Sequence, residues 1–493
     1  MRLVRIVDDL LDRITMYRLV LYGLGLLVSV GVGLSYAGTL SISGNSLILS
    51  TATLLGVCYI TNRGLAFAWD AASNSESSLI TALILACILP PATSLRIWIA
   101  IALAGMLAIA SKYLIAFRAK HLFNPAAIAV LALSLANLLQ ASWWVGSKAM
   151  LPYTLVLGLL VVRKLRRFQL VASFTAAALA VMVIIGHIHG HETRYTLSQA
   201  FTSWPLIFFG TIMLTEPATM PPRNRTRVMY GLLVGSAFAS QLHLDTIAAT
   251  PEAALVFGNF FAYLVSPRYK LRLRLASKTQ MGPRILDLRF TPDRIPTFLP
   301  GQYIEVTLPH PQTDGRGNRR TFTIASSPTE STLALGVRFY TPSSSFKQAL
   351  ARLNPGDKVI AGQIAGDFVL PTDPSQKLVF IAGGIGITPF RSMLKYLIDT
   401  EQQRDILLLY FVSDPADVSY RDVLAQAAAI GARVKVFVKS HLTADQLRTL
   451  TPNYADTHFY ISGPNHMVET NQALLQQMSI PRQHIRTDHF SGY

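Results

Sequence analysis

The chain has 493 residues, of which 51% are hydrophobic and 14% are charged, and its formal net charge is +17. Soluble globular domains carry about 25% charged residues, so this composition predicts a large membrane portion. Both cysteines, Cys58 and Cys87, lie within apolar runs. A disulfide framework, a cysteine-ligated zinc and a four-cysteine iron–sulfur cluster formed by this chain alone are therefore excluded.

The basic residues of the first half occur in short clusters between apolar runs rather than along one polar face. This distribution indicates membrane topology and argues against nucleic acid as a partner. The N-terminal segment carries several charges before its apolar run and lacks a small-residue cleavage site. We expect a cytoplasmic lead-in rather than a removed signal peptide.

Apolar windows suited to membrane spans of about 20 residues follow one another through the first 270 residues. They fall near 17–36, 46–62, 77–91, 95–116, 122–140, 147–162, 169–188, 198–215, 228–244 and 252–266. If the N-terminus is cytoplasmic, the inner loops collect the clusters at 163–167, 223–227 and 268–274, whereas the outer loops keep few cations. The positive-inside rule then places residues after 268 in the cytoplasm and predicts a multi-pass protein of the inner membrane.

Four stretches carry a resemblance to a known family. They are "SSLITALILACILPP" (77–91), "SKYLIAFRAKHLFNPAAIAV" (111–130), "LTEPATMPPRNRTRVMYGLLVG" (214–235) and "PEAALVFGNFFAYL" (251–264). They resemble the D subunit of Rnf electron-transport complexes and the B subunit of sodium-translocating NADH:quinone reductases. The resemblance implies a bundle that holds flavin and carries electrons within the membrane.

One departure from that family concerns its covalent flavin. The Ser-Gly-Ala-Thr stretch whose threonine carries FMN in family members does not occur in this sequence. We therefore expect a non-covalent FMN or riboflavin as the candidate cofactor of the membrane domain.

Polar residues within the apolar half leave alternatives open. The Asn-Pro step at 124–125 is either a kink satisfied by neighbouring helices or a break that lines a cofactor or ion path. Glu216 is either an interfacial or pocket carboxylate or a proton carrier. The segment with His187, His189 and His191 is either a plain loop or a metal-binding pair with i, i+4 spacing.

After residue 270 the pattern changes to alternating strands and turns. "KLRLRLASKTQMGPRILDLRFTP" and "FLPGQYIEVTLP" alternate with period two, which predicts an antiparallel β-barrel over 271–372. From 373 to 493, apolar strands alternate with helices, which predicts a parallel α/β domain. The whole is thus a multi-domain chain, with a polytopic α-helical membrane bundle of about ten spans in residues 1–270.

These two soluble segments resemble the ferredoxin-NADP reductase superfamily, through "RTFTIASS", "TPSSSFKQAL", "GDKVIAGQIAGDF", "AGGIGITPF" and "YISGPNHMV". The resemblance implies FAD and NAD(P)H as cofactors. A guanidinium suits the flavin pyrophosphate, and a helix start with small hydroxyl residues suits the same anion. The expected FAD contacts are Arg320, Thr321, Phe322 beside the isoalloxazine, Thr323 near its N5, Ser344 and Ser345.

"AGGIGITPF" follows an apolar strand and opens a helix, so its glycines allow a nucleotide diphosphate close to the backbone. It is not the Gly-x-Gly-x-x-Gly fingerprint. "YISGP" stands where the superfamily has Cys-Gly-Pro near the nicotinamide, with serine in place of the cysteine. The expected nucleotide contacts are Gly383, Gly384, Gly386, Thr388, Gly463 and Pro464.

The chain ends with "RTDHFSGY", which resembles tails whose aromatic residues cover the flavin ring. Phe490 or Tyr493 is expected over the isoalloxazine, and Thr323, Ser462 and Tyr493 are the expected catalytic residues. A packed tail without this role is the alternative.

Asp414 follows the strand "DILLLYFVS" and would suit a free ribose hydroxyl, which favours NADH, whereas Arg421 favours NADPH. The sequence thus predicts a membrane-bound oxidoreductase that moves electrons from NAD(P)H through FAD to an extracytosolic flavoprotein. Membrane quinone is the alternative acceptor. A transporter or channel regulated by a redox-sensing reductase is the alternative of another class.

Overall fold

The computed structural model describes residues 11, 14–69, 75–117, 120–240, 243–244, 247–248, 250–266, 271–310, 318–341, 343–452 and 454–490. The chain divides into two compact units, Met1–Tyr269 and Lys270–Tyr493. The first is mainly helical, and the second contains a six-stranded and a five-stranded sheet.

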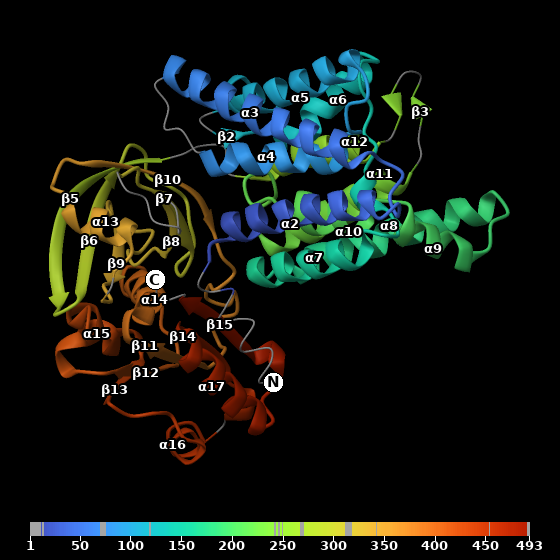
Figure 1. Cartoon of the computed structure of the whole chain (residues 1–493). Coiled ribbons are helices and arrows are strands. Elements are labelled where there is room, and N and C mark those ends of the chain that lie inside the picture. Colours follow the sequence, from blue (N-terminus) through green and yellow to red (C-terminus); the bar gives the residue numbers. More distant parts are fainter. Residues whose placement is uncertain are drawn as a thin grey trace. The chain divides into compact units, whose positions relative to one another are not determined.

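Every apolar window of the first unit contains helix (Figure 1). The helices are α2 Met16–Tyr36, α3 Gly44–Ala68, α4 Ser75–Ile88, α5 Leu95–Leu114, α6 Pro125–Leu135, α7 Leu151–Leu165, α8 Phe168–Ile188, α9 Thr193–Thr202, α10 Leu206–Phe208, the π-helix η2 Phe209–Met213, α11 Asn224–Ala239 and α12 Pro251–Val265.

Short polar side chains begin several of these helices. Thr15 Oγ1 accepts a hydrogen bond from the Arg18 N–H at 3.3 Å, and Asn124 Oδ1 accepts one from the Ala127 N–H at 3.1 Å. Such caps satisfy N–H groups that have no partner within the helix. Pro125 then takes the first helical position, where its missing N–H does no harm.

Four helices in the described part of the chain are long and apolar enough to cross a membrane: α2, α3, α5 and α8. Shorter apolar helices are α4, α6 and α12. Large apolar side chains also face outward, including Phe67 at 91% and Ile188 at 73% exposure. Helices that are apolar on their outer faces suit a lipid surrounding. The count of ten spans stays a prediction.

The sequence predicted one continuous helix over 198–215, but the structure shows an interrupted one. Helix α9 ends at Thr202, and after Pro205 the chain continues through α10 into the π-helix η2. Proline lacks the N–H that a continuing helix requires, and π-helical turns are commonly found at functional sites.

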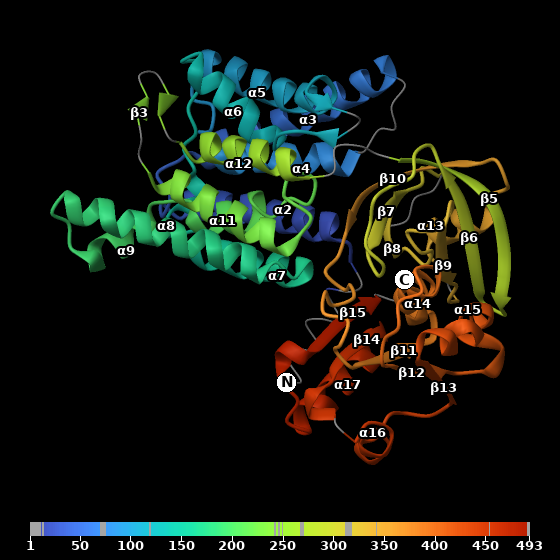
Figure 2. The ribbon, with the colours of Figure 1, turned by 180° about the vertical axis from the view of Figure 1, so that it is seen from behind.

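Small residues let some of the helices approach closely. Helix α11 packs along α8, as both views of the chain show (Figure 2). A Cβ on Gly231 would lie 2.2 Å from Ser173 Oγ, and one on Gly235 would lie 2.4 Å from the Phe174 carbonyl oxygen. This pair of glycines one turn apart is the spacing that favours close helix contacts in membranes.

The six-stranded sheet of the second unit is antiparallel, in the order β8-β7-β10-β5-β6-β9. Ala325 N–H donates to the Ala334 carbonyl at 2.8 Å, which links the end of β8 to β9. Full closure into a barrel stays a prediction. The elements are β5 Leu271–Gly282, β6 Ile285–Pro292, β7 Tyr303–Thr307, β8 Arg319–Thr323, β9 Leu333–Arg338, the helix α13 Ser345–Arg352 and β10 Lys358–Ala365.

The five-stranded sheet is parallel, in the order β13-β12-β11-β14-β15. Alternate residues of its strands pack on opposite faces, so that Phe380 lies in one core with Phe390, and Ile381 lies in another with Val468. Its elements are β11 Leu378–Gly383, α14 Thr388–Asp399, β12 Ile406–Val412, α15 Arg421–Gln426, β13 Ala432–Val438, α16 Ala444–Leu450, β14 His458–Pro464, α17 Asn465–Gln477 and β15 Ile485–Phe490.

Candidate functional site

A cavity of about 470 Å³ lies at the carboxyl ends of β11, β12 and β14. In the observed strand order, β11 and β14 are neighbours although two strands separate them in sequence. Open α/β sheets bind ligands at such a point, where the strand order reverses. Gly383, Gly384 and Pro464 line the cavity, so three of the expected nucleotide contacts share one site.

Glycine is required in the turn after β11. Gly384 has φ +52°, and a Cβ there would lie 2.9 Å from Arg338 Nη1. A Cβ on Gly386 would lie 2.2 Å from the Ser462 carbonyl oxygen, which belongs to β14. The backbone of this turn is therefore bare, and it meets the neighbouring strand directly.

Helix α14 begins directly after this turn with Thr388, whose Oγ1 donates to the Ile385 carbonyl at 3.0 Å. The N-terminus of a helix attracts anions through its unsatisfied N–H groups and its dipole. Together with the Arg338 guanidinium at the cavity wall, it suits a phosphate group.

Ser462 Oγ is fully buried and has no hydrogen-bond partner within the described part of the chain. Its residue lies in β14, opposite Ala382 of β11. A buried hydroxyl without a partner is destabilising, and Ser462 is not itself among the residues that line the cavity. Gly463 and Pro464 follow it at the end of the same strand.

The expected flavin residues meet around Phe346, at the start of α13. The Phe322 ring lies 6.0 Å from the Phe346 ring at an angle of 29°, and the Arg320 guanidinium lies 5.3 Å from the same ring. Thr323 is buried and stands opposite Tyr303 in the ladder between β7 and β8. The structure thus places "RTFT" beside "SSSF", which are more than twenty positions apart in the sequence.

The two serines before Phe346 have protein partners. Ser344 Oγ caps α13 by accepting from the Lys347 N–H at 3.3 Å, and Ser345 Oγ lies 2.9 Å from His310 Nε2. Ser344 acts as an acceptor in its contact, so its hydroxyl can still donate to an anion beside the backbone N–H groups of the helix start. Thr321 is exposed on β8.

The C-terminal aromatic residues lie at or beyond the end of the described part of the chain. The backbone of Phe490 pairs with Pro464 at the end of β15, but its side chain lies outside the described residues. Tyr493 also lies outside them. Their placement over the isoalloxazine stays a prediction.

The cavity lining includes basic residues that the sequence did not predict as nucleotide contacts. They come from β9 and from the segments that follow β13 and β14. The segments after β13 and β14 could have been recognised from the sequence, because each directly follows a strand of the parallel sheet. By contrast, Asp414 Oδ1 accepts from the Ala416 N–H at 2.8 Å, and Arg421 donates to the Pro415 carbonyl at 2.7 Å; neither lines the cavity. The missed residues are the cations Arg338 and Lys439 and the histidines His441 and His466.

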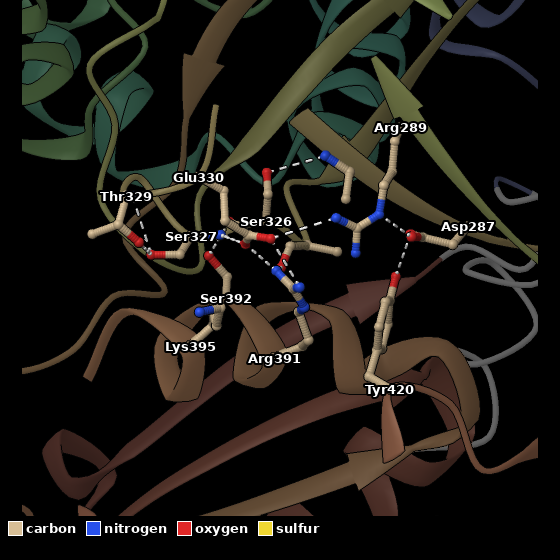
Figure 3. A network of polar contacts seen from close by, with 12 residues as sticks. Asp287, Arg289, Ser326, Ser327, Thr329, Glu330, Arg391, Ser392, Lys395 and Tyr420 are labelled. Atoms are coloured by element: carbon tan, nitrogen blue, oxygen red, sulfur yellow. Dashed lines mark hydrogen bonds and ion pairs between the residues drawn. The ribbon is translucent and has the colours of Figure 1, made fainter. Parts of the chain in front are cut away.

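A buried polar network, here named the clasp, joins the two sheets (Figure 3). It consists of Asp287, Arg289, Glu330, Arg391 and Tyr420. Tyr420 OH donates to Asp287 Oδ1 at 3.0 Å, Arg289 Nε donates to Asp287 Oδ2 at 3.0 Å, and Arg391 binds Glu330 through both terminal nitrogens. Burial raises the pKa of Asp287, and burial together with Asp287 raises the pKa of Tyr420.

In the first unit, two of the motifs singled out above come into contact. Asn124 Nδ2 donates to Glu216 Oε2 at 2.8 Å, and the Asn124 N–H donates to Asn259 Oδ1 at 2.7 Å. Asn259 in turn donates to Tyr230 OH at 3.0 Å. Asn124 and Glu216 line a cavity of about 50 Å³, so Glu216 is a pocket carboxylate.

A comparison with protein families matches residues 380–473 to the oxidoreductase NAD-binding domain. Flavohemoprotein A of Dictyostelium discoideum is 25% identical over 241 residues, which are 43% of this chain and 58% of that protein. The flavohemoprotein of Bacillus anthracis is 25% identical over 342 residues, or 63% of this chain and 80% of that protein.

The second unit therefore contains an NAD-binding domain of the oxidoreductase type. The matched residues belong to the parallel sheet and its helices, and the antiparallel sheet precedes them in the same unit. The bare turn at Gly384, which lines the cavity, fits such a domain.

Two further matches cover different shares of the chain. The reductase subunit of stachydrine N-demethylase from Rhizobium meliloti is 29% identical over 153 residues, which are 30% of this chain and 42% of that protein. A flavohemoglobin structure from Malassezia yamatoensis gives a TM-score of 0.43 at 17% identity, covering 65% of this chain and 96% of that one. The chain spans little more than half the length of the first flavohemoproteins it matches, 58% and 54%.

Proposed function

We propose that this chain is an FAD-dependent oxidoreductase of the membrane that takes electrons from cytoplasmic NAD(P)H and passes them into or across the membrane through its first unit. The observation that carries the proposal is the presence, in one chain, of a reductase module and four helices able to span a membrane. The resemblance of the bundle to Rnf D subunits supports an electron-transfer role, and the hydrogen bond from Asn124 to Glu216 brings two of the resembling motifs together.

Within the reductase we propose an FAD-binding domain at 271–372 and an NAD(P)-binding domain at 373–493. NAD(P)H supplies a hydride and FAD accepts it when both are bound. Arg320 holds the flavin diphosphate, Phe322 packs on the flavin, and Thr323 donates a hydrogen bond to it. The turn at 383–386 holds the nucleotide diphosphate, and Ser462 orients the nicotinamide.

Sealed inside-out vesicles test the direction of electron transfer. NAD(P)H is added outside and ferricyanide, which does not cross membranes, is enclosed in the lumen. Reduction of the enclosed ferricyanide without added quinone is the expected result and implies an acceptor on the far side, such as a flavoprotein. Reduction that requires added quinone would identify the chain as a quinone reductase, and no reduction in either case would overturn the proposal.

One observation favours a different class of function. The cavity at Glu216 holds about 50 Å³, which is room for a few waters rather than for a three-ring flavin. A transporter or channel regulated by the reductase would use the polar groups at such a pocket, here Asn124 and Glu216. Acid extraction of the purified chain separates the two: FMN or riboflavin beside FAD supports electron transfer by the bundle, and FAD alone supports the alternative.

A further inference from the structure

The outer face of the antiparallel sheet carries a group of cations near the start of β5. Arg272 and Arg274 are exposed, whereas the leucines that alternate with them are buried. Alternate residues of a strand point to opposite faces, so both arginines lie on the solvent face. Lys358 of β10 is also exposed and stands directly opposite Arg274 in the ladder. Arg272, Arg274 and Lys358 are here named the basic face.

The basic face is electrostatically unfavourable in the isolated chain. Like charges directly opposite one another across an antiparallel ladder repel, as Arg274 and Lys358 must. None of the three cations forms an ion pair with another described residue. An anionic surface laid against this face would relieve the repulsion.

The carboxylates on the adjoining segments only partly offset this charge. Glu305 of β7 lies 3.9 Å from the Arg319 guanidinium. Asp357 Oδ2 accepts from the Asn354 N–H at 2.8 Å, and Asp293 is exposed just after β6. Cations therefore dominate the solvent face at the start of β5.

Two exposed apolar side chains border the basic face. Ile360 of β10 stands opposite Arg272 in the ladder and is 41% exposed. On the other side of β5, the Asp293 N–H donates to the Arg272 carbonyl at 2.9 Å, and Ile295, two residues further on, is 70% exposed. A face that combines cations with exposed apolar side chains suits the headgroup region of an anionic membrane.

The length of the chain between the two units limits how far this face can lie from a membrane. Helix α12 ends at Val265, and β5 begins at Leu271. Six residue steps span at most about 22 Å when fully extended. The sequence adds Arg268 and Lys270 to this connection. In a chain anchored by its first unit, the basic face thus follows the last apolar helix at short range.

We propose that the basic face docks on the anionic lipid headgroups of the cytoplasmic leaflet, with Ile295 and Ile360 among the headgroups. This rests on the proposed membrane location of the first unit. Basic residues near an anionic surface are attracted to it, and salt screens that attraction. The position of the reductase unit therefore depends on lipid charge. An acidic protein is the competing occupant, but the short connection after α12 supplies a lipid surface in every copy of the chain.

Fluorescence from one labelled site on the full chain tests the docking. Ile295→Cys carries the polarity-sensitive dye NBD, and the chain is placed in nanodiscs of phosphatidylcholine alone or with added phosphatidylglycerol. In the anionic nanodiscs the emission should move to shorter wavelength and rise at least about twofold, because the dye leaves water. Added salt should reverse the change. Val436→Cys, at a 43% exposed position of β13 in the other sheet, should not respond.

Two charge variants test the source of the attraction. The first replaces the basic face: Arg272→Gln, Arg274→Gln and Lys358→Gln. The matched variant removes three exposed cations from the segments of the parallel sheet: Lys377→Gln, Arg433→Gln and Lys435→Gln. The first should lose the response to anionic lipid, and the second should keep it. None of the six positions lines the nucleotide cavity, so both variants should oxidise NAD(P)H with ferricyanide within about twofold of the wild-type rate.

The outcomes separate this docking from the proposed function. Equal emission in the two lipids, or a response that the basic-face variant retains, would overturn the docking. Short-wavelength emission in both lipids would assign the face to a protein partner instead. In these cases enclosed ferricyanide would still be reduced in sealed vesicles, so the proposed function would stand. Release of the chain from membranes by alkaline carbonate would overturn the membrane location on which both rest.

Discussion

The Arg320 side chain contacts two other residues, Phe346 and Arg319. Its guanidinium lies over the Phe346 ring, and its Nη1 donates to the Arg319 carbonyl at 2.6 Å. These contacts hold a permanent cation beside the first turn of α13, where an anion is also favoured by the helix end. The neighbouring Arg319 occupies the alternate position on the same strand, with its guanidinium 3.9 Å from Glu305.

We predict that Arg320→Gln weakens FAD binding while Arg319→Gln does not. The loss of one charge-assisted contact to the diphosphate should lower FAD affinity by about tenfold to a hundredfold. The flavin content after dialysis, read from the visible absorption of the purified chain, measures this. Unchanged flavin content in Arg320→Gln would remove the residue from the FAD site.

Asp287 is predicted to make stability depend on pH. Its pKa is raised by burial, so the folded chain holds its proton more tightly than the unfolded chain does. Its contribution to the free energy of unfolding is greatest below the unfolded pKa of about 3.9. That contribution is lost as the pH rises through the higher folded pKa. Asp287→Asn should therefore flatten the fall in thermal midpoint as the pH rises above about 4.

The matched control for that prediction is Asp293→Asn, an exposed carboxylate just after the same strand. This variant should follow the wild-type profile. A profile of Asp287→Asn that parallels the wild type across the whole range would show that Asp287 does not titrate with folding.

At the scale of elements, the clasp connects strand β6 and the loop after β8 to α14 and α15. Close packing accompanies it, because a Cβ on Gly336 of β9 would lie 2.7 Å from Tyr420 OH and 2.7 Å from Thr388 Cγ2. The same strand continues to Arg338, which pairs with Asp417 at 3.0 Å. Since Arg338 also lines the nucleotide cavity, the contacts that join the two sheets also shape one wall of the site.

We predict that Arg391→Met strongly destabilises the reductase unit. The Arg391 side chain is 2% exposed and Glu330 is 15% exposed, so removal of the arginine leaves a largely buried carboxylate whose remaining cation is Arg289, at 3.6 Å. Removal of one partner of a buried pair costs up to about 3–5 kcal/mol, which should appear as a lower temperature of FAD release.

Lys395→Met provides the comparison, since the Lys395–Asp399 pair lies within one helix and is more exposed, at 26% and 22%. An exposed pair contributes about 0–1 kcal/mol. The double variant Arg391→Met, Glu330→Gln should recover part of the loss. Additive losses in the double variant would show that the two residues act independently.

At the scale of the whole molecule, the orientation of α8 tests the membrane topology. This helix is one of the four candidate spans, and its ends are marked by the exposed residues Arg166 and His189. The positive-inside rule places the arginine cluster at 163–167 in the cytoplasm and the histidine segment outside.

Single cysteines at these ends should therefore react differently with a maleimide that does not cross membranes. In intact cells we expect labelling of His189→Cys, and labelling of Arg166→Cys only after permeabilisation. The native Cys58 and Cys87 are both fully buried, so the unmodified chain is a suitable unlabelled control. Equal labelling of both positions in intact cells would exclude α8 as a membrane span.

Much of the fold could be predicted from local sequence, and part of it could not. Long apolar windows predicted helices because a membrane span needs about 20 apolar residues whose backbone groups bond within the segment, yet Pro205 interrupted one window through its missing N–H. The glycine turn after β11 was predicted because strand, turn and helix follow one another in the chain. Arg338 was missed because it enters the nucleotide cavity from β9, in the other sheet.

The sequence by itself determined the apolar first half, the alternating second half and the bare turn at 383–386, because each depends on residues that are neighbours along the chain. Only the tertiary structure decided that Asn124 bonds Glu216, that Asp414 turns to Ala416, and that Lys439 reaches the cavity. These contacts depend on strand order and packing between segments far apart in sequence. Neither composition nor periodicity encodes such contacts, so spacing alone could not reveal them.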